Sequence, residues 1–203
     1  MARDNSRPVR RRTLTREKVI GAALGIVEDA GWEQLTMSTL SGSLGIAAAS
    51  LYNHVRNLDD VRSAIQVRAM TDLGLHLREV AMGRSGIDGL RALIDAHRAW
   101  AVEHPRLYRA LTAAPVDRDA LVGAALDANV ALRTMLSSCG VPEDESLEVA
   151  ISMFAALHGF ATLEGSGFLG SEPDLDQIYE TVVRGVLASV PLGDARTGRN
   201  EPV

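Results

Sequence analysis

Residues 44–55 read LGIAAASLYNHV, and this stretch indicates what kind of surface the chain builds. Three alanines and a serine lead into a tyrosine, an asparagine and a histidine. A buried helix would carry bulkier apolar side chains, and a helix that faces only water would carry charges. Small residues followed by hydrogen-bonding side chains instead favour a short helix that lies close against another polar surface.

The residues before this stretch predict two further helices. Thr15 is suited to cap a first helix, which Gly31 ends. Thr36 or Ser38 is suited to cap a short second helix, which Gly45 ends. The first helix carries apolar residues at helical spacing: Val19, Ala23, Ile26, Val27 and Ala30. With a third helix inside the quoted stretch, this is the order of a helix-turn-helix, with the motif over about 36–55.

The second helix of such a unit enters the major groove of DNA. The alanines would let the backbone approach closely and touch thymine methyl groups, and the serine and asparagine could read base edges. The tyrosine and histidine could donate to phosphate oxygens. Leu51 and Val55 should face inward, against Val27 and Leu40. The candidate DNA-binding residues are Thr36, Ser38, Ala47, Ala48, Ser50, Tyr52, Asn53, His54 and, in the N-terminal arm, Arg10, Arg11 and Arg12.

The charge of the chain is divided unevenly along its length. The formal net charge is -5, yet residues 1–62 hold nine basic and seven acidic residues. The arginines at 7, 10, 11 and 12 form a basic arm on an otherwise acidic chain, which indicates contact with an anionic polymer at one end. A disordered solubilising tail is the alternative interpretation of this arm, which we expect to span residues 1–14.

The composition favours a soluble helical protein. Hydrophobic residues make up 46% of the 203 residues and aromatic ones 4%, and Ala, Leu, Arg and Glu favour helix. We expect no apolar run near the roughly 20 residues that span a bilayer, no secretory signal and no membrane partner. The single Cys139 excludes a disulfide framework within one chain, and we expect a small, partly buried helix residue there. The simplest compartment is the cytoplasm.

The remaining residues predict helices as well, so the expected fold is all-α with about nine helices. The expected helices run over about 58–82, 87–103, 105–112, 117–138, 143–164 and 175–190. We assign residues 15–60 to a three-helix DNA-binding domain and 61–190 to a larger domain for ligand binding and dimerisation. Residues 191–203 should form a disordered tail.

The first 62 residues resemble the DNA-binding domain of the TetR family of bacterial repressors. The resemblance rests on Ala22-Ala23 and Gly31, on Leu35-Thr36-Met37 and Leu40, on Leu44-Gly45-Ile46 and above all on Leu51-Tyr52-Asn53-His54-Val55. It implies an all-helical homodimer in which three helices bind a double-stranded DNA operator. It also implies that a larger C-terminal domain pairs the subunits and binds a small-molecule inducer, with no cofactor and no enzymatic activity.

Two positions depart from the family pattern. Leu58 stands where the family usually has a lysine that meets phosphate, and Ser41 stands where it usually has alanine. We hypothesise that the arginines at 10–12 offset this loss by reaching the adjacent minor groove. Deletion of residues 1–12 tests the hypothesis, since it should lower both the DNA affinity and the salt dependence of that affinity.

The C-terminal part resembles more loosely a subgroup of the TetR/AcrR type named after a Trp-His-Gly motif, here with Leu157 before His158-Gly159. The residues that we expect to line or flank a ligand pocket are Met70, His97, Trp100, His104, Tyr108, Met135, Phe154 and His158. Packing in an ordinary core is the alternative role for these residues. A metal site is not expected, because the histidines lack i, i+4 spacing to another ligand.

Small and apolar residues on the last two long helices predict a four-helix dimer interface. They are Ile151, Ala155, Gly159, Thr162, Ile178, Val182 and Val186. Two other functions remain open at this point, a DNA-binding regulator without a ligand and, more remotely, an all-helical enzyme. A mostly apolar cavity of several hundred Å³ would favour the inducible regulator over both.

Overall fold

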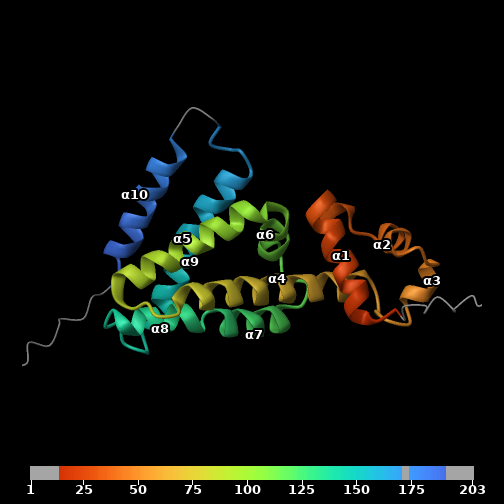
Figure 1. The fold of residues 1–203 in the computed structure, drawn as a ribbon, viewed down its shortest axis with the longest axis horizontal. Coiled ribbons are helices and arrows are strands. Elements are labelled where there is room, and N and C mark those ends of the chain that lie inside the picture. The colour runs from red at the N-terminus through yellow and green to blue at the C-terminus, as the bar shows by residue number, and fades with distance from the viewer. Residues whose placement is uncertain (1–13, 171–173, 191–203) are drawn as a thin grey trace, which may run out of the picture.

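The computed structural model describes residues 14–170 and 174–190, which form α-helices and one 3-10 helix but no strand (Figure 1). The elements are α1 (Arg16–Ala30), η1 (Trp32–Gln34), α2 (Met37–Leu44), α3 (Ala48–Leu51), α4 (Leu58–Ala81), α5 (Gly86–Glu103), α6 (Pro105–Thr112), α7 (Arg118–Ala128), α8 (Val130–Ser138), α9 (Ser146–Gly165) and α10 (Leu175–Ala188). The all-α prediction is therefore confirmed, and nine of these ten α-helices have seven or more residues. The expected arm, apart from Leu14, and the expected tail lie outside the described residues.

Local sequence explains why α1 and α2 begin and end where they do. The Thr15 hydroxyl accepts from the Lys18 amide at 3.3 Å, and Gly31 ends α1 with φ of 97°. At α2, the Thr36 hydroxyl accepts from the Thr39 amide at 3.0 Å, and Gly45 is left-handed with φ of 64°. These are the capping positions that the sequence predicts. Glycine is favoured at the C-terminal end of each helix because it adopts positive φ without a Cβ clash.

The third helix is shorter than the sequence predicts. α3 ends at Leu51, whereas we expected helix to about Val55. Beyond Leu51 the His54 amide donates to the Leu51 carbonyl at 2.8 Å, which tightens the chain into a turn before it reverses into α4. Leu51 and Val55 are both buried with Val27 and Leu40, as predicted, so this tight segment is still held against α1 and α2.

The long helix α4 connects the two halves of the molecule (Figure 1). Its N-terminal half contributes Val61 and Ile65 to the core that also holds α1 to α3, and Leu77 packs against the second core around α5, α8, α9 and α10. α6 lies beside the end of α1, where Arg106 donates to the Glu28 and Asp29 carbonyls at 2.9 and 2.5 Å. The two domains are therefore joined by packed helices rather than by a flexible linker.

Residues 117–138 form two helices, α7 and α8, where the sequence predicts one. The break lies at Asn129, whose side-chain nitrogen donates to the Ala125 carbonyl at 2.9 Å. A side chain that bonds the carbonyl four residues back competes with the backbone ladder and bends a helix. Beyond the break α8 contacts α5 and α9 as well as α4, whereas α7 lies mainly against α4.

Helix α9 corrects the expectation that no apolar run approaches the length of a membrane span. Among the described residues it is the one helix that is long and apolar enough to cross a membrane, judged by length and composition only. About a third of it is buried within the protomer. One face, with Met153, Leu157 and Phe160, packs in the C-terminal core, and the opposite face exposes Ile151. An exposed apolar face of this kind calls for a covering partner.

Candidate DNA-binding surface and internal cavity

The candidate DNA-binding residues of the quoted stretch lie at the end of the molecule remote from α10 (Figure 1). The Tyr52 side chain is 58% exposed, and Asn53, Ala47 and Ala48 are exposed as well. Ser50 and His54 are half-buried. Since Leu51 between them is fully buried, the stretch presents its polar side chains outward on a fixed apolar anchor.

The other candidate DNA-binding residues divide into two groups. Thr36 and Ser38 are exposed at the start of α2, although the Thr36 hydroxyl is already engaged with the Thr39 amide and hydroxyl, each at 3.0 Å. A hydroxyl that accepts from an amide still has its own proton, which it can donate to a phosphate oxygen. Arg10, Arg11 and Arg12 lie outside the described residues.

Asp60 connects the three segments at the base of this surface through hydrogen bonds. Its carboxylate accepts both terminal nitrogens of Arg16 at 2.7 and 2.9 Å and the Arg56 amide at 2.8 Å. Arg16 also reaches the His54 carbonyl at 3.4 Å. The start of α1, the turn after α3 and the start of α4 thus meet at one carboxylate, whose side chain is 8% exposed.

The electrostatics of this junction follow from the same contacts. The hydrogen bond from Arg16 holds the pKa of Asp60 well below its usual range, against the opposing effect of burial. From the sequence alone, Asp60 is an acidic residue in the first turn of α4, where the helix dipole favours negative charge, and its pairing with Arg16 is not predicted. Nothing in their spacing of 44 positions could signal the pairing, which depends on how α1 packs against α4.

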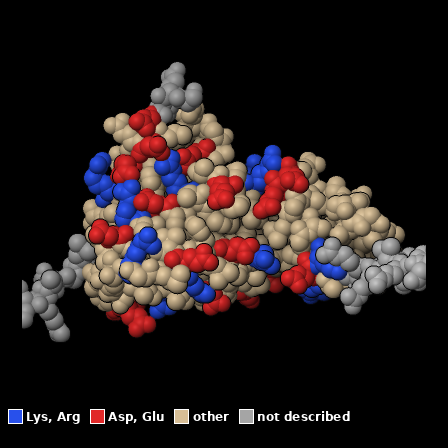
Figure 2. All heavy atoms as spheres, viewed as in Figure 1, with Lys and Arg blue, Asp and Glu red and all other residues tan. Residues whose placement is uncertain are grey.

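Most charged side chains lie away from the end formed by α1 to α3 (Figure 2). Figure 2 shows a mixture of acidic and basic groups over α4 to α10, whereas the end formed by α1 to α3 presents mainly uncharged side chains in that view. Backbone amides, hydroxyls and small side chains can then approach a duplex without repelling its phosphates. Arg16 and Arg56, two basic residues at this end, lie at the Asp60 carboxylate, which offsets part of their charge.

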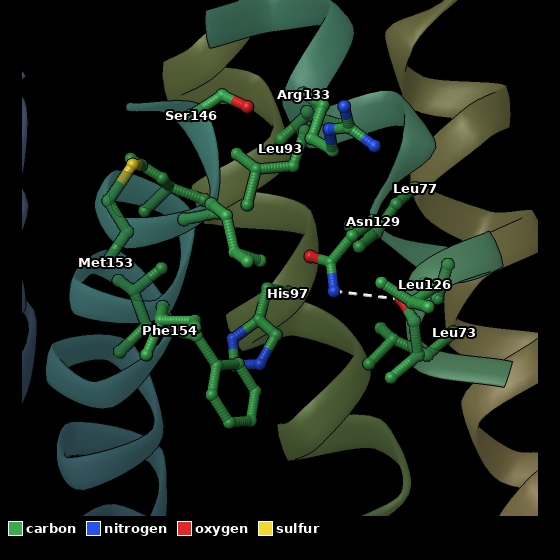
Figure 3. Close-up of a pocket in the computed structure, with 18 of the residues that line it drawn as sticks. Leu73, Leu77, Leu93, His97, Leu126, Asn129, Arg133, Ser146, Met153 and Phe154 are labelled. Atoms are coloured by element: carbon green, nitrogen blue, oxygen red, sulfur yellow. Dashed lines mark hydrogen bonds between the residues drawn. The ribbon is translucent and has the colours of Figure 1, made fainter. Parts of the chain in front are cut away.

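The C-terminal domain contains a partly open cavity of about 480 Å³ between α4, α5, α7, α8 and α9 (Figure 3). Most of its wall is apolar, with Leu73 and Leu77 from α4, Leu93 from α5, and Met153 and Phe154 from α9. Its volume and lining are those of sites that bind small molecules. It also meets the criterion of several hundred Å³ that separates an inducible regulator from one with a filled core.

The structure places three of the eight expected pocket residues in the wall of this cavity. These are Met70, His97 and Phe154. The other five do not line it, and they are Trp100, His104, Tyr108, Met135 and His158. Met135 is buried in the core against Gly89, and His104 lies at the junction of α5 and α6, 4.0 Å from the Glu28 carboxylate. Helical spacing alone could not tell which side of α5 and α6 faces the cavity.

A row of polar side chains runs behind the cavity wall from His97. The Tyr108 hydroxyl lies 3.4 Å from Nε2 of His97 and 3.0 Å from Nδ1 of His158. Burial lowers the pKa of His97 to about 4, with a smaller effect from His158, so the His97 ring is neutral at neutral pH. Burial lowers the pKa of His158 and raises that of Tyr108. The row connects the cavity to α6, which packs on α1.

Sequence reasoning missed several residues of the wall. Asn129 and Leu132 were placed inside one continuous helix, and the bend between α7 and α8 turns both toward the cavity. The one available signal was Asn129 itself, because asparagine is a weak helix former in a helix interior. Charged lining residues are Arg133, Glu143 and Asp144, with Arg133 and Glu143 paired at 3.2 Å. Within residues 14–170 and 174–190 no three potential metal ligands cluster.

The expected dimer residues are only partly available to a partner. On α9, Ile151, Ala155, Gly159 and Thr162 are exposed along one face. On α10, Ile178 and Val182 are half-buried, and Val186 is only 6% exposed because it packs in the core of its own protomer. Val186 is therefore a core residue in this structure, with little surface left for an interface.

These features define the class of protein: an all-helical DNA-binding regulator with a helix-turn-helix at one end and a cavity-bearing domain at the other. Residues 90–186 match the family described as "Tetracyclin repressor-like, C-terminal domain". The HTH-type transcriptional regulator Rv0681 of Mycobacterium tuberculosis is 33% identical over 172 residues, 84% of this chain and 78% of that protein. The chain therefore belongs to the TetR family of transcriptional regulators.

Solved structures share the fold at low sequence identity. A possible TetR family transcriptional regulator from Streptomyces coelicolor matches with a TM-score of 0.66 at 16% identity, over 85% of this chain and 97% of its own. BioQ, solved with its double-stranded DNA operator, matches with a TM-score of 0.60 at 18% identity, over 87% and 99% of the two chains. Regulators of this family bind DNA operators and are generally not enzymes.

Proposed function

We propose that this protein is a cytoplasmic, homodimeric repressor that binds a palindromic operator and is released by a small molecule. Residues 15–60 would bind the DNA, and residues 61–190 would bind the ligand and pair the subunits. The observation that carries the proposal is the apolar cavity of about 480 Å³, part of whose wall is formed by the same helix, α4, that begins at the DNA-binding surface.

Helix α4 supplies the mechanical connection for release. Leu73 and Leu77 line the cavity, and Asp60 of the same helix holds Arg16 and the turn after α3. A continuous helix transmits a tilt at one end to the other. A ligand that favours a different tilt of α4 would change the separation of the two DNA-binding surfaces in the dimer. By linkage, operator binding must weaken ligand binding by the same factor.

The exposed face of α9 supports the homodimer. Its small residues Ala155, Gly159 and Thr162 allow close approach of a second helix, whereas the exposed Ile151 also lines the cavity. A two-fold axis at this face would present two recognition segments to the same side of a duplex. Such dimers read half-sites about 34 Å apart in successive major grooves. A single short α3 with few polar side chains would have little specificity alone.

The experiment that tests the DNA-binding part is selection of the purified protein on randomised duplex DNA, with the affinity then measured at several salt concentrations. We expect a palindrome with half-sites about one helical turn apart and a falling affinity with salt. Asn53→Ala should relax the preference at particular base pairs by about 1–3 kcal/mol, whereas Tyr52→Phe should weaken binding to all sequences alike. Recovery of no sequence above background by a folded dimer would refute the proposal.

A further inference from the structure

The wall of the cavity contains a buried side chain with an unused hydrogen-bonding atom. His97 is 6% exposed, and its Nε2 faces the Tyr108 hydroxyl at 3.4 Å. Its Nδ1 has no partner among the described residues. In the described part of the chain, one fully buried side-chain nitrogen or oxygen lacks a hydrogen-bond partner, and it is Nε of Arg62. Nδ1 of His97, which also lacks a partner, is therefore not fully buried. Nδ1 of His97 therefore borders open space.

A second polar group faces the same space from the opposite wall. Asn129 donates from its side-chain nitrogen to the Ala125 carbonyl at 2.9 Å, and a carbonyl can only accept. This contact fixes the orientation of the amide and leaves its oxygen free. Figure 3 shows that oxygen directed into the cavity, on the side where the His97 ring projects toward Phe154. The amide oxygen is a hydrogen-bond acceptor.

The tautomer of His97 follows from the contacts behind it. The Tyr108 hydroxyl has one proton to donate and two imidazole nitrogens within reach, at 3.0 Å in His158 and at 3.4 Å in His97. We assign the Tyr108 proton to the nearer nitrogen, in His158, so that the phenol oxygen accepts from Nε2–H of His97. The Thr162 hydroxyl lies 3.4 Å from the same nitrogen of His158. A neutral imidazole that is protonated on Nε2 carries a lone pair on Nδ1. The cavity thus presents two acceptors, Nδ1 of His97 and the Asn129 oxygen.

The cavity offers no free positive charge. Among its described lining residues, Arg133 is the one cation, and it is paired with Glu143 at 3.2 Å, with Asp144 also in the lining. His97 adds no charge at neutral pH, because burial lowers its pKa to about 4. A carboxylate placed near His97 would face two acceptors and lose its hydration without compensation, which is costly. An ether or ester would leave both acceptors unpaired.

We propose that the ligand of this cavity is a neutral, largely apolar molecule with a hydroxyl group, alcohol or phenol, that donates to Nδ1 of His97. The inference rests on the proposed function, since it specifies the chemistry of the inducer. In this arrangement the apolar part fills the space between Leu73, Leu93 and Met153. Tyr108 acts as a positioning residue that fixes the acceptor form of His97.

The test uses three probes of nearly equal shape: 4-octylphenol, 4-octylanisole and 4-octylbenzoate. Calorimetric titration into the full-length protein at neutral pH should give the tightest binding for the phenol, by roughly tenfold or more over the other two, because only the phenol has a proton to donate to Nδ1 of His97. His97→Phe should reduce the advantage of the phenol over the anisole. The matched control is His104→Phe, the same substitution at a histidine outside the cavity, which should leave the advantage intact.

A second variant separates the positioning role of Tyr108 from general packing. Tyr108→Phe keeps the aromatic ring but removes the hydroxyl that fixes which nitrogen of His97 carries the proton. The affinity for the phenol should therefore fall toward that for the anisole, while the affinity for the anisole stays unchanged. Equal affinities of the wild type for the phenol and the anisole would overturn the proposal and would indicate an apolar site that does not recognise a hydroxyl. A higher affinity for the benzoate would overturn it too. Binding of none of the probes by the folded protein would overturn it as well. Operator affinity of the same sample then decides separately whether the DNA-binding function stands.

Discussion

At the scale of single residues, Asp60 gives the DNA-facing end its shape. One carboxylate accepts from the Arg16 guanidinium and the Arg56 amide, and Arg16 in turn reaches the His54 carbonyl. Charge-assisted hydrogen bonds of this kind are stronger than neutral ones, especially in the two-pronged geometry of arginine. Asp60 and Arg16, which belong to α4 and α1, therefore hold the turn after α3 in place. Helix α3 itself has only four residues.

We predict that Asp60→Asn lowers the free energy of unfolding by about 1–2 kcal/mol at neutral pH. The pKa of Asp60 is lower in the folded than in the unfolded protein, because Arg16 stabilises the carboxylate. The stabilisation is therefore complete above the unfolded pKa of about 3.9 and is lost as the pH falls toward the folded pKa. Urea unfolding between about pH 6 and about pH 3 should show the difference between wild type and variant shrinking.

The neighbouring carboxylate supplies the control for this prediction. Asp59 lies in the same first turn of α4 and is exposed. Asp59→Asn removes the same charge from the helix dipole without breaking the Arg16 contact. An equal loss of stability in both variants, or a loss in Asp60→Asn that does not depend on pH, would show that the pairing with Arg16 is not the cause.

At the scale of elements, the contact between α4 and α7 depends on the absence of a side chain. Gly74 is buried in α4, and a Cβ at this position would lie 2.7 Å from both Cα and Cβ of Ala128. Gly74 therefore lets the two helices approach more closely than other residues would allow. Because Leu73 and Leu77 beside it line the cavity, this approach also sets the distance between two of its walls.

We predict that Gly74→Ala destabilises the protein, although alanine favours helix by about 1 kcal/mol over glycine. The added methyl group meets backbone atoms of α7 that cannot move aside alone, and overpacking of this kind costs about 1–3 kcal/mol. The matched control is Gly123→Ala in α7, where nothing lies within 4 Å of the new Cβ. Chemical denaturation should show a stabilised Gly123→Ala protein, and stabilisation of Gly74→Ala as well would contradict the close packing.

At the scale of the whole molecule, α4 connects two apolar cores. In addition, α9 exposes apolar side chains on the surface. α6 provides a second connection through the hydrogen bonds of Arg106 to the end of α1. In the proposed mechanism, a change at the cavity would reach the helices α1 to α3 through α4 and through α6. The uncovered face of α9 is the place where a second copy would fix the spacing of two such surfaces.

We predict that Ala155→Glu, which places a charge in the exposed face of α9, dissociates the dimer and lowers the operator affinity with it. A carboxylate at a helix–helix contact would be buried without a partner, which is strongly unfavourable. Val122→Glu places the same charge on an exposed position of α7 and should leave the dimer intact. Sedimentation equilibrium measures both variants. A monomeric wild type, or an unchanged dimer of Ala155→Glu, would move the interface elsewhere.

The sequence by itself determined the class of fold and predicted which end of the molecule binds DNA. Caps at Thr15 and Thr36, glycines at 31 and 45, and inward-facing Leu51 and Val55 are local features, whose physical cause lies within a few residues of chain. Helical periodicity likewise predicted every long helix, except for the bend at Asn129. The family follows from the same local motif.

Only the tertiary structure decided which faces of those helices meet. The Arg16–Asp60 pairing, the approach at Gly74 and the cavity wall with Asn129 all join residues that are distant along the chain. Five of the eight expected pocket residues fall behind the wall because apolar and aromatic residues at helical spacing suit a core and a cavity equally. Periodicity determines which residues share one face of a helix. Which face borders the cavity depends on the helices that pack against it, and those helices come from the whole chain.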